Sequence, residues 1–269
     1  MFGTLHLPAD EPATGVVVCG PLQAELLRNY RREVLLARRL AATGIAVKRF
    51  HYRGSGHSDG ATSAVTLQTM VDDALAAAAE LERNGVGRIA FMGTRWGAVV
   101  AARAAATRGA PLLMWEPVMQ ASRYFDEILR FRLMREINED PTSSLVQQDL
   151  IDELHLTGNV DVLGHTLELS LFESAAGTSL AGLVDDSTSP ALLVQIGVGR
   201  SLRKEYVALA AGMRSRGADV TTEVVVDREA WWISGDRWPV HETHPPTEKL
   251  VDATVAWATA HLTAMEPVQ

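Results

Sequence analysis

The chain has 269 residues, 47% of them hydrophobic, and a formal net charge of −8 at pH 7. This length and apolar content suit one large α/β domain, or such a domain with an inserted lid. The acidic balance offers no basic surface, so neither nucleic acid nor membrane insertion is expected. Neither a signal-peptide pattern nor a membrane-spanning apolar run is found, which predicts a cytoplasmic protein. Spaced Cys/His sets and phosphate-binding glycine fingerprints are absent, so no metal and no cofactor are expected.

Short β-branched runs alternate with long helical patterns along the chain. This alternation predicts a mostly parallel, doubly wound sheet with crossover helices. The expected strands are 15–20, 45–52, 88–93, 110–118, 190–198 and 219–227. The expected helices are 28–43, 66–84, 96–108, 202–216 and 247–263. The last of these follows two prolines, a residue suited to the first turn of a helix.

Residues 121–186 interrupt the alternation between two expected strands. The segment opens with an amphipathic pattern, SRYFDEILRFRLMREI (122–137), and continues with polar loops and shorter apolar runs. Its apolar residues exceed what one crossover helix needs. We therefore expect a helical lid inserted into a core formed by residues 1–120 and 187–269. An ordinary long crossover is the alternative.

Unusual loops follow four of the expected strands. In doubly wound sheets, ligands bind outside the carboxyl ends of the strands, where such loops lie. The loops are CGPLQAE (19–25), FHYRGSGHSDG (50–60), MGTRWGA (92–98) and WEPV (115–118). The carboxyl edge of the sheet is therefore the expected place of a binding site.

Two of these loops resemble motifs of the α/β-hydrolase superfamily. YRGSGHS resembles its D-x-R-G-x-G-x-S turn, with His51 at the usual aspartate, and MGTRWGA resembles its G-x-S-x-G nucleophile elbow. Residues 20–60 and 112–133 also resemble the exosortase-system-associated hydrolase-like proteins in spacing and character. The resemblance implies an α/β-hydrolase fold over almost the whole chain, with a mostly parallel sheet and a helical lid.

The catalytic triad that this resemblance implies is missing from its usual positions. In such enzymes a histidine, oriented by a carboxylate, activates a nucleophile at the elbow. Arg95 stands at the nucleophile position, GVGR (197–200) has no carboxylate, and DREAWWISGDRW (227–238) has no histidine. Ordinary Ser–His–Asp hydrolysis is therefore not expected.

Arg95 occupies a position where the elbow presents a side chain at a helix N-terminus. Free backbone N–H groups and the helix dipole favour anions there. A guanidinium adds a permanently charged, planar fork that fits a carboxylate or a phosphate. The N–H of Trp96 and one near Pro21 and Leu22 are expected at the oxyanion-hole positions. The sequence thus predicts an anion-binding site, and the alternative is an arginine that filled a dead site.

A buried guanidinium needs a carboxylate or a bound anion as its partner. Glu116 ends the strand after the elbow helix and is the expected carboxylate. It can neutralise Arg95, or it can act as a general base with a raised pKa. These roles conflict, because a tight pair with Arg95 lowers the pKa of Glu116.

Three further residues are candidates for acid–base catalysis. His51 follows its strand directly and can face the cleft, or it can be a hydrogen-bonded structural residue. Asp227 lies at a strand end. His241 lies in the loop before the last helix, from which a catalytic histidine can reach the site, although a surface position is the alternative.

Three tryptophans share the loop EAWWISGDRWP (229–239). Trp231, Trp232 and Trp238 either cap the edge of the sheet or form the wall of an apolar pocket. With the Phe, Leu and Met residues of the expected lid, such a pocket suits a bulky acyl or polyketide-like molecule. Its polar end would be a carboxyl, an ester or a similar oxyanion.

Three functions follow as hypotheses from these residues. The first is a non-hydrolytic enzyme, most simply a lyase that eliminates an acetate-like carboxylate from an acyl ester while Arg95 stabilises the leaving anion. The second is a catalytically silent protein that binds an acyl or acidic ligand. The third is an atypical esterase with a directly activated water. All three imply a small-molecule partner, and they leave open whether the chain forms a homodimer.

Overall fold

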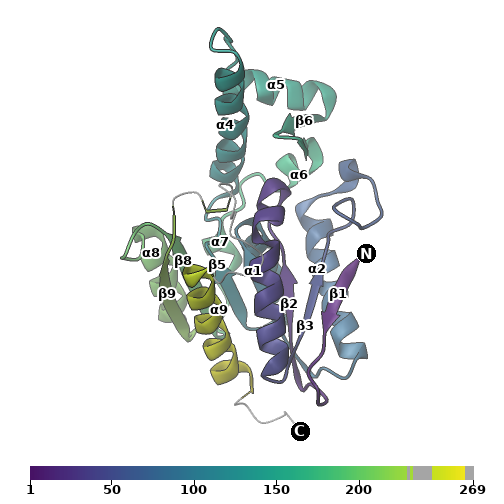
Figure 1. Ribbon diagram of the computed structural model, residues 1–269, viewed down its shortest axis with the longest axis vertical. Coiled ribbons are helices and arrows are strands. Elements are labelled where there is room, and N and C mark those ends of the chain that lie inside the picture. Colours follow the sequence, from purple (N-terminus) through teal and green to yellow (C-terminus); the bar gives the residue numbers. More distant parts are fainter. Residues whose placement is uncertain (229–230, 233–243, 264–269) are drawn as a thin grey trace.

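A seven-stranded sheet forms the centre of the computed structural model, which describes residues 1–228, 231–232 and 244–263 (Figure 1). Its strand order is β1-β3-β2-β4-β5-β8-β9 within this described part. The first strand pairs antiparallel with its neighbour, and the other pairings of this sheet are parallel. The strands are β1 (Gly3–His6), β2 (Thr14–Cys19), β3 (Ile45–Phe50), β4 (Arg88–Thr94), β5 (Leu112–Trp115), β8 (Ala191–Gly197) and β9 (Val220–Val226).

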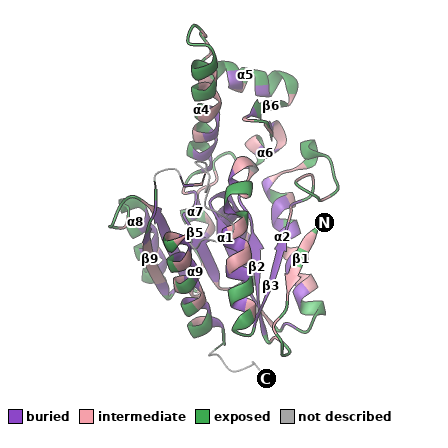
Figure 2. Cartoon of the chain, in the orientation of Figure 1, coloured by how far each residue is buried: buried purple, intermediate pink, exposed green. Residues whose placement is uncertain are grey.

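Helices cover both faces of the sheet and create two apolar cores. One core lies under α1 (Gln23–Ala42) and α9 (Pro245–Ala258). The other lies under α2 (Leu67–Arg83), α3 (Trp96–Arg108) and α8 (Lys204–Ser215). Successive residues of β2 point to opposite cores, Val16 and Val18 to the first and Val17 and Cys19 to the second. Every residue of β2 is therefore buried, as the purple strands between the helices in Figure 2 show.

The segment 121–186 contains four helices and a hairpin among the elements described. Figure 1 shows α4, α5 and β6 standing beyond the end of the main sheet. The buried side chains of α4 include Tyr124, Phe125, Ile128 and Leu129. The elements are α4 (Ala121–Glu139), α5 (Gln147–Thr157), β6 (Asn159–Val162), β7 (His165–Glu168), α6 (Leu169–Ser174) and α7 (Leu180–Leu183). The division into core and lid stays a prediction.

Each strand and helix expected from the sequence is found; α3 has the expected ends, and the other elements have shifted ends. The strand expected at 110–118 covers only Leu112–Trp115, because Glu116 adopts φ 46° and ends it. The first helix begins at Gln23 and not at 28. The sequence analysis missed β1, the β6–β7 hairpin and the short helix η1 (Thr62–Ala64), while the helix expected at 247–263 is divided into α9 and the π-helical turn η2 (Thr259–Thr263). Four-residue strands carry too little periodicity to be predicted without their pairing partners.

Two glycines let the β4–α3 turn pack against its neighbours. A Cβ on Gly97 would lie 2.0 Å from the carbonyl oxygen of Cys19, at the end of β2. A Cβ on Gly93 would lie 2.2 Å from the backbone carbon of Gly97. These distances are far below van der Waals contact, so both positions require glycine. The turn that carries Arg95 thus lies directly against the loop that leads into α1.

We expect Gly97→Ala to destabilise the protein by about 3 kcal/mol or more, because backbone atoms must move to admit the methyl group. The matched control is Gly197→Ala, where the added Cβ meets no atom within 4 Å. Its effect is expected to stay within about 0.5 kcal/mol. Urea unfolding followed by circular dichroism measures both, and equal midpoints for the two variants would contradict the packing argument.

Candidate functional site

Arg95 occupies a strained turn between β4 and α3. Its backbone has φ 53° and ψ −117°, a region that costs a non-glycine residue about 1–3 kcal/mol. The N–H of Arg95 donates to the Trp115 carbonyl at 2.9 Å, and its own carbonyl accepts from Ala98 N–H at 3.1 Å. These bonds hold the side chain at the carboxyl edge of the sheet. The turn therefore keeps the sharp geometry of a nucleophile elbow around an arginine.

The Arg95 guanidinium is buried between two carboxylates and an aromatic ring. Its Nε donates to Glu25 Oε1 at 3.3 Å, and its Nη2 donates to Glu127 Oε2 at 2.8 Å. The Trp232 ring lies 4.1 Å from the guanidinium carbon, within cation–π distance. Only 6% of Arg95 is exposed. The expectation that Glu116 is the direct partner of Arg95 is wrong, because these partners come from α1 and α4 and Glu116 is paired with Arg203.

The charges in this cluster depend on one another. Burial raises the pKa of Glu25 to about 7, although the neighbouring Arg95 opposes this shift. Burial alone lowers the pKa of Arg95, but Glu25 and Glu127 outweigh it and raise this pKa above its ordinary value. The guanidinium therefore stays charged, while Glu25 can gain or lose a proton near neutral pH.

Glu116 is held in a different ion pair. Its Oε2 accepts from the Ile196 N–H at 2.7 Å, and its Oε1 is paired with Arg203, in the loop after β8. Burial raises the pKa of Glu116, and the Arg203 charge works against that shift. The Arg203 guanidinium also lies 4.4 Å from the centre of the Tyr206 ring. Glu116 thus joins the end of β5 to β8 and the loop that follows it.

A cavity of about 250 Å³ lies beside Arg95. Three arginines, Arg95, Arg123 and Arg203, contribute to its lining, together with the two glutamates Glu127 and Glu205. Aromatic side chains of Tyr124, Tyr206 and Trp232 complete much of the remaining wall. A cavity with cationic groups and aromatic rings suits a small anion with an apolar part.

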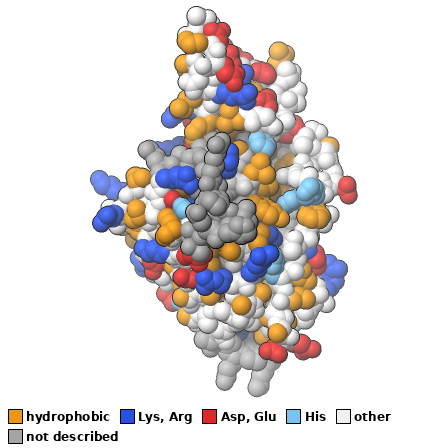
Figure 3. All heavy atoms as spheres, viewed as in Figure 1, with side chains coloured by type: hydrophobic (Ala, Val, Ile, Leu, Met, Phe, Trp, Pro, Cys, Tyr) orange, Lys and Arg blue, Asp and Glu red, His pale blue; other side chains and the backbone are white. Residues whose placement is uncertain are grey.

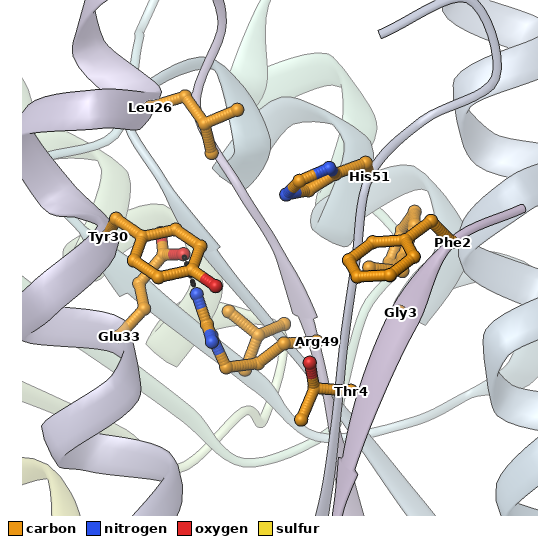
Figure 4. A pocket seen from close by; sticks show the side chains of 10 residues that line it. Phe2, Gly3, Thr4, Leu26, Tyr30, Glu33, Arg49 and His51 are labelled. Carbon is orange, nitrogen blue, oxygen red and sulfur yellow. Dashed lines mark ion pairs between the residues drawn. The ribbon is translucent and has the colours of Figure 1, made fainter. Parts of the chain in front are cut away.

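His51 does not face this cavity. Figure 4 shows its ring in a separate small pocket between α1, β1 and β3, together with Tyr30, Arg49 and Phe2. The His51 Nδ1 accepts from the His57 N–H at 3.1 Å, and the two rings stack. The expectation that His51 serves catalysis in the cleft is therefore wrong. Its alternative, a hydrogen-bonded structural residue, is the arrangement found.

Asp227 is also engaged in a structural pair. Its Oδ2 accepts from Arg32 Nη2 at 2.7 Å, and both side chains are almost fully buried. Arg32 lies on α1, and its guanidinium carbon is 4.6 Å from the centre of the Trp231 ring. The cavity beside Arg95 is not lined by Asp227. The interpretation of Asp227 as an acid–base residue is thus corrected to that of a buried ion-pair partner.

The tryptophans divide between the two roles expected for them. Trp231 is buried, and its Nε1 donates to the Ile196 carbonyl at 3.1 Å, which caps the edge of the sheet. Trp232 lines the cavity and covers Arg95. Trp238 and His241 lie outside the described residues.

The expected oxyanion-hole residues lie at two neighbouring helix N-termini. Trp96 begins α3, and Leu22 precedes the first residue of α1, directly after the buried Pro21. The first amides of a helix have no partner inside that helix, so they are available to an anion. The close packing of Gly97 on Cys19 brings the two turns together. Their oxyanion role stays a prediction.

The sequence analysis missed Glu25, Glu127 and Arg203 as members of the site. Glu25 lies within the quoted loop CGPLQAE and Glu127 within the quoted helix pattern, but no motif distinguishes either residue. Arg203 lies between a strand and a helix without any motif. The only signal in the sequence was that a buried Arg95 needs carboxylate partners. This need does not indicate which carboxylates in the chain they are.

No metal centre is evident in the described ranges 1–228, 231–232 and 244–263, where no group of three or more His, Cys, Asp and Glu side chains is arranged to hold an ion. Among the helices that the structure describes, none combines the length and apolar character needed to cross a membrane. Figure 3 shows basic and acidic side chains interspersed over the face in view.

Comparison with known proteins establishes the fold. The family model described as serine aminopeptidase, S33, matches residues 13–134, and no curated protein matches the sequence. Est1E from Butyrivibrio proteoclasticus superposes with a TM-score of 0.62 at 16% identity, over 97% of this chain and 94% of that chain. A monoacylglycerol lipase from Paleococcus ferrophilus gives a TM-score of 0.60 at 16% identity, over 97% and 98%. An esterase from Pyrococcus furiosus gives 0.62 at 15% identity, over 93% and 83%.

These matches and the sheet topology show that the chain has the α/β-hydrolase fold, as the sequence predicted. Its similarity to esterases and lipases is a similarity of fold, since the identities are low. The resemblance to exosortase-system-associated proteins stays a prediction.

We expect Glu25→Gln to change how stability depends on pH. The folded-state pKa of Glu25 is raised to about 7 from an ordinary value of 4.5, so folding binds a proton between these values. The contribution of Glu25 to stability is therefore full below about pH 4.5 and is lost as the pH rises towards about 7. A glutamine side chain does not titrate, so the variant does not lose this contribution to stability as the pH rises.

Melting temperatures from about pH 5 to about pH 8 test this expectation. The variant should gain stability relative to the original protein as the pH rises. Parallel melting curves across this range would show that the Glu25 carboxyl does not titrate as its burial implies.

Proposed function

We propose that this chain is an α/β-hydrolase-fold lyase that works without an acyl-enzyme. It eliminates a carboxylate from an acyl ester or polyketide-like substrate bound in the cavity beside Arg95. The observation that carries the proposal is a buried guanidinium, at the turn between β4 and α3, on the wall of that cavity. Such a group cannot attack a carbonyl carbon, but it stabilises a leaving anion.

The charge on the cavity wall supports this assignment. The bonds to Glu25 and Glu127 use only part of the donors of the Arg95 guanidinium, so others remain for an anion. Arg203 and Arg123 add positive charge on the same wall, which Glu205 there and the Arg203–Glu116 pair offset in part. Because Arg95 is nearly fully buried, its attraction for a developing negative charge is weakly screened.

Glu127 is our candidate for the base. Its side chain lines the cavity and is 32% exposed, and Arg95 fixes one of its oxygens at 2.8 Å. In the proposed step, Glu127 takes a proton from the carbon next to the substrate carbonyl. The C–H electron pair forms a C=C bond, the C–O bond to the carboxylate breaks, and the carboxylate leaves with that electron pair. Solvent then takes the proton from Glu127.

A catalytically silent binding protein is the second candidate. It is favoured by the double pairing of Arg95, because two carboxylates already satisfy the buried charge without a ligand. This candidate binds an acyl or acidic ligand saturably and releases it unchanged.

An atypical esterase is the third candidate. Esterases and a lipase are among the structures with the same fold. This function needs a water activated directly by a carboxylate such as Glu127 or Glu116. It differs from elimination in the source of the oxygen atoms in the products.

We expect a 3-acetoxyacyl thioester probe in ¹⁸O-labelled water to give unlabelled acetate and an α,β-unsaturated acyl thioester. Elimination breaks the C–O bond on the acyl-chain side, so no water oxygen enters either product. Mass spectrometry distinguishes these products. One ¹⁸O atom in the acetate, with a 3-hydroxyacyl product, would replace the lyase assignment by the esterase, and binding without turnover would replace it by the silent protein.

We expect Arg95→Gln to lower kcat/KM for this probe by about 10²-fold or more, because the leaving anion loses its cationic partner. Glu127→Gln should lower kcat by a comparable factor. The control is Arg108→Gln, which removes a half-exposed guanidinium paired with Glu82, away from the cavity. Steady-state kinetics at matched folded concentration measure the three variants. An Arg95 variant as active as the control would refute the role of the guanidinium.

A further inference from the structure

A small polar pocket lies between α1, β1 and β3, apart from the cavity beside Arg95 (Figure 4). Among the described residues, its lining has no member in common with the lining of that cavity. Its volume is about 10 Å³, close to the smallest space that holds one water molecule or one ligand oxygen. Phe2 and Tyr30, which line it, are exposed, so a solute can reach the pocket from solvent.

Arg49 is buried in this pocket without a close partner for its charge. Only 7% of Arg49 is exposed, and its Nε donates to no acceptor in the part of the chain that the structure describes. Its Nη2 lies 3.9 Å from Glu33 Oε2, which is beyond hydrogen-bond distance. The guanidinium carbon also lies 4.4 Å from the centre of the Tyr30 ring. A buried donor without an acceptor is costly, so an acceptor in the pocket stabilises Arg49.

Three further polar groups surround the same space. Glu33 is 2% exposed, and its Oε1 has no hydrogen-bond partner among the described residues. The His51 Nδ1 accepts from the His57 N–H, so the proton of the neutral ring is on Nε2. Figure 4 shows the His51 ring and the Tyr30 hydroxyl reaching into the pocket from opposite sides. The pocket therefore offers N–H and O–H donors together with one carboxyl.

A carboxylate fits these groups better than a cation does. An ammonium group would meet one acceptor, Glu33, and would be repelled by the buried charge of Arg49. A carboxylate oxygen accepts from the Arg49 guanidinium and from the His51 Nε2–H. Glu33 then has to carry a proton, which it can donate to the same carboxylate. A carboxylate thus uses the donors of the pocket and the otherwise unpartnered Glu33 together.

We propose that this pocket binds a small monocarboxylate, with one oxygen beside Arg49 and the apolar part against Phe2 and Tyr30. The site goes beyond the proposed lyase function and does not depend on it, because a different set of residues forms it.

The proposed site binds a carboxylate more tightly as the pH falls. Burial raises the pKa of Glu33 to about 7, although the Arg49 charge opposes this shift. Above this pH, Glu33 is ionised and repels the ligand. Below it, Glu33 is protonated and donates to the ligand. Between pH 6 and pH 8, linkage to one such proton weakens binding by about tenfold.

The other titratable groups around the pocket do not oppose this direction. Burial and the charge of Arg49 lower the pKa values of His6 and His51, so both rings gain charge only as the pH falls. Burial raises the pKa values of Cys19 and Tyr52, near Glu33, so both stay neutral. The remaining charged or titratable neighbours are Arg38, Tyr30 and His57.

Titration calorimetry of the whole chain with sodium acetate, in a buffer without carboxylates, tests the site. Saturable binding is expected, and Arg49→Gln should lower the acetate affinity by about tenfold or more, because the ligand loses a charged donor. The matched control is Arg38→Gln, which removes an exposed arginine of α1 that does not line the pocket. This control and Arg95→Gln should both keep the affinity of the original protein.

A second variant covers the case that Arg49→Gln folds poorly. Thr4→Trp obstructs the pocket from an exposed position on β1 and leaves Arg49 in place, so it should also abolish acetate binding. Its control is Leu7→Trp, an exposed position just after β1 that does not line the pocket. Glu33→Gln should bind acetate at pH 6 and should not show the tenfold weakening at pH 8.

The outcomes separate this site from the cavity beside Arg95. Acetate binding that Arg49→Gln and Thr4→Trp leave unchanged overturns the proposal. If Arg95→Gln abolishes that binding instead, the anion belongs to the cavity, which supports the proposed function while it overturns this site. Absence of saturable acetate binding would leave the pocket to an ordered water only and would also overturn it. Equal affinities at pH 6 and pH 8 would exclude the arrangement in which Glu33 donates a proton.

Discussion

A guanidinium buried at the end of a parallel strand must find negative partners, and the structure around Arg95 satisfies that constraint with two carboxylates. Glu25 comes from α1, and Glu127 comes from α4 in the segment beyond the sheet. One cation therefore connects the β4–α3 turn, the helix α1 that covers the sheet, and the helix α4 of the segment 121–186. Removing Arg95 would leave the buried Glu25 carboxyl without its cation, which is more costly than the pair itself is stabilising.

The same use of ion pairs extends to the neighbouring strand ends. Glu116 after β5 is paired with Arg203, and Asp227 after β9 is paired with Arg32. In the fold's hydrolytic members, these edges carry the acid and lead to the histidine of a triad. Here, the carboxylates at the corresponding strand ends are paired with arginines of the same chain. The chain thus has the scaffold of an α/β-hydrolase, and the loss of acylation chemistry is part of our proposal.

What remains available to a ligand is a cavity whose wall carries guanidinium groups, two carboxylates and aromatic rings. The guanidinium groups suit an anion, and the aromatic rings of Tyr124, Tyr206 and Trp232 give apolar area. Charged and aromatic groups in one cavity fix both the position and the orientation of a ligand that has a polar and an apolar part. This combination is the physical basis for our proposal of an acyl substrate with an acidic leaving group.

The sequence by itself determined the order of the main strands and helices along the chain, because the alternation of β-branched runs with helical patterns is a local property. It also determined the elbow, because the small residues around Arg95 are recognisable as a motif. Only the tertiary structure decided which carboxylates meet Arg95. Glu25, Glu127 and Arg95 are far apart in the chain, and an exposed and a buried helix charge look alike in a sequence. His51 and Asp227 were misjudged for the same reason, since the end of a strand does not reveal which side of the sheet a side chain enters. Such placement is set by the packing of α1 and α4 against the sheet, which depends on contacts across the whole chain.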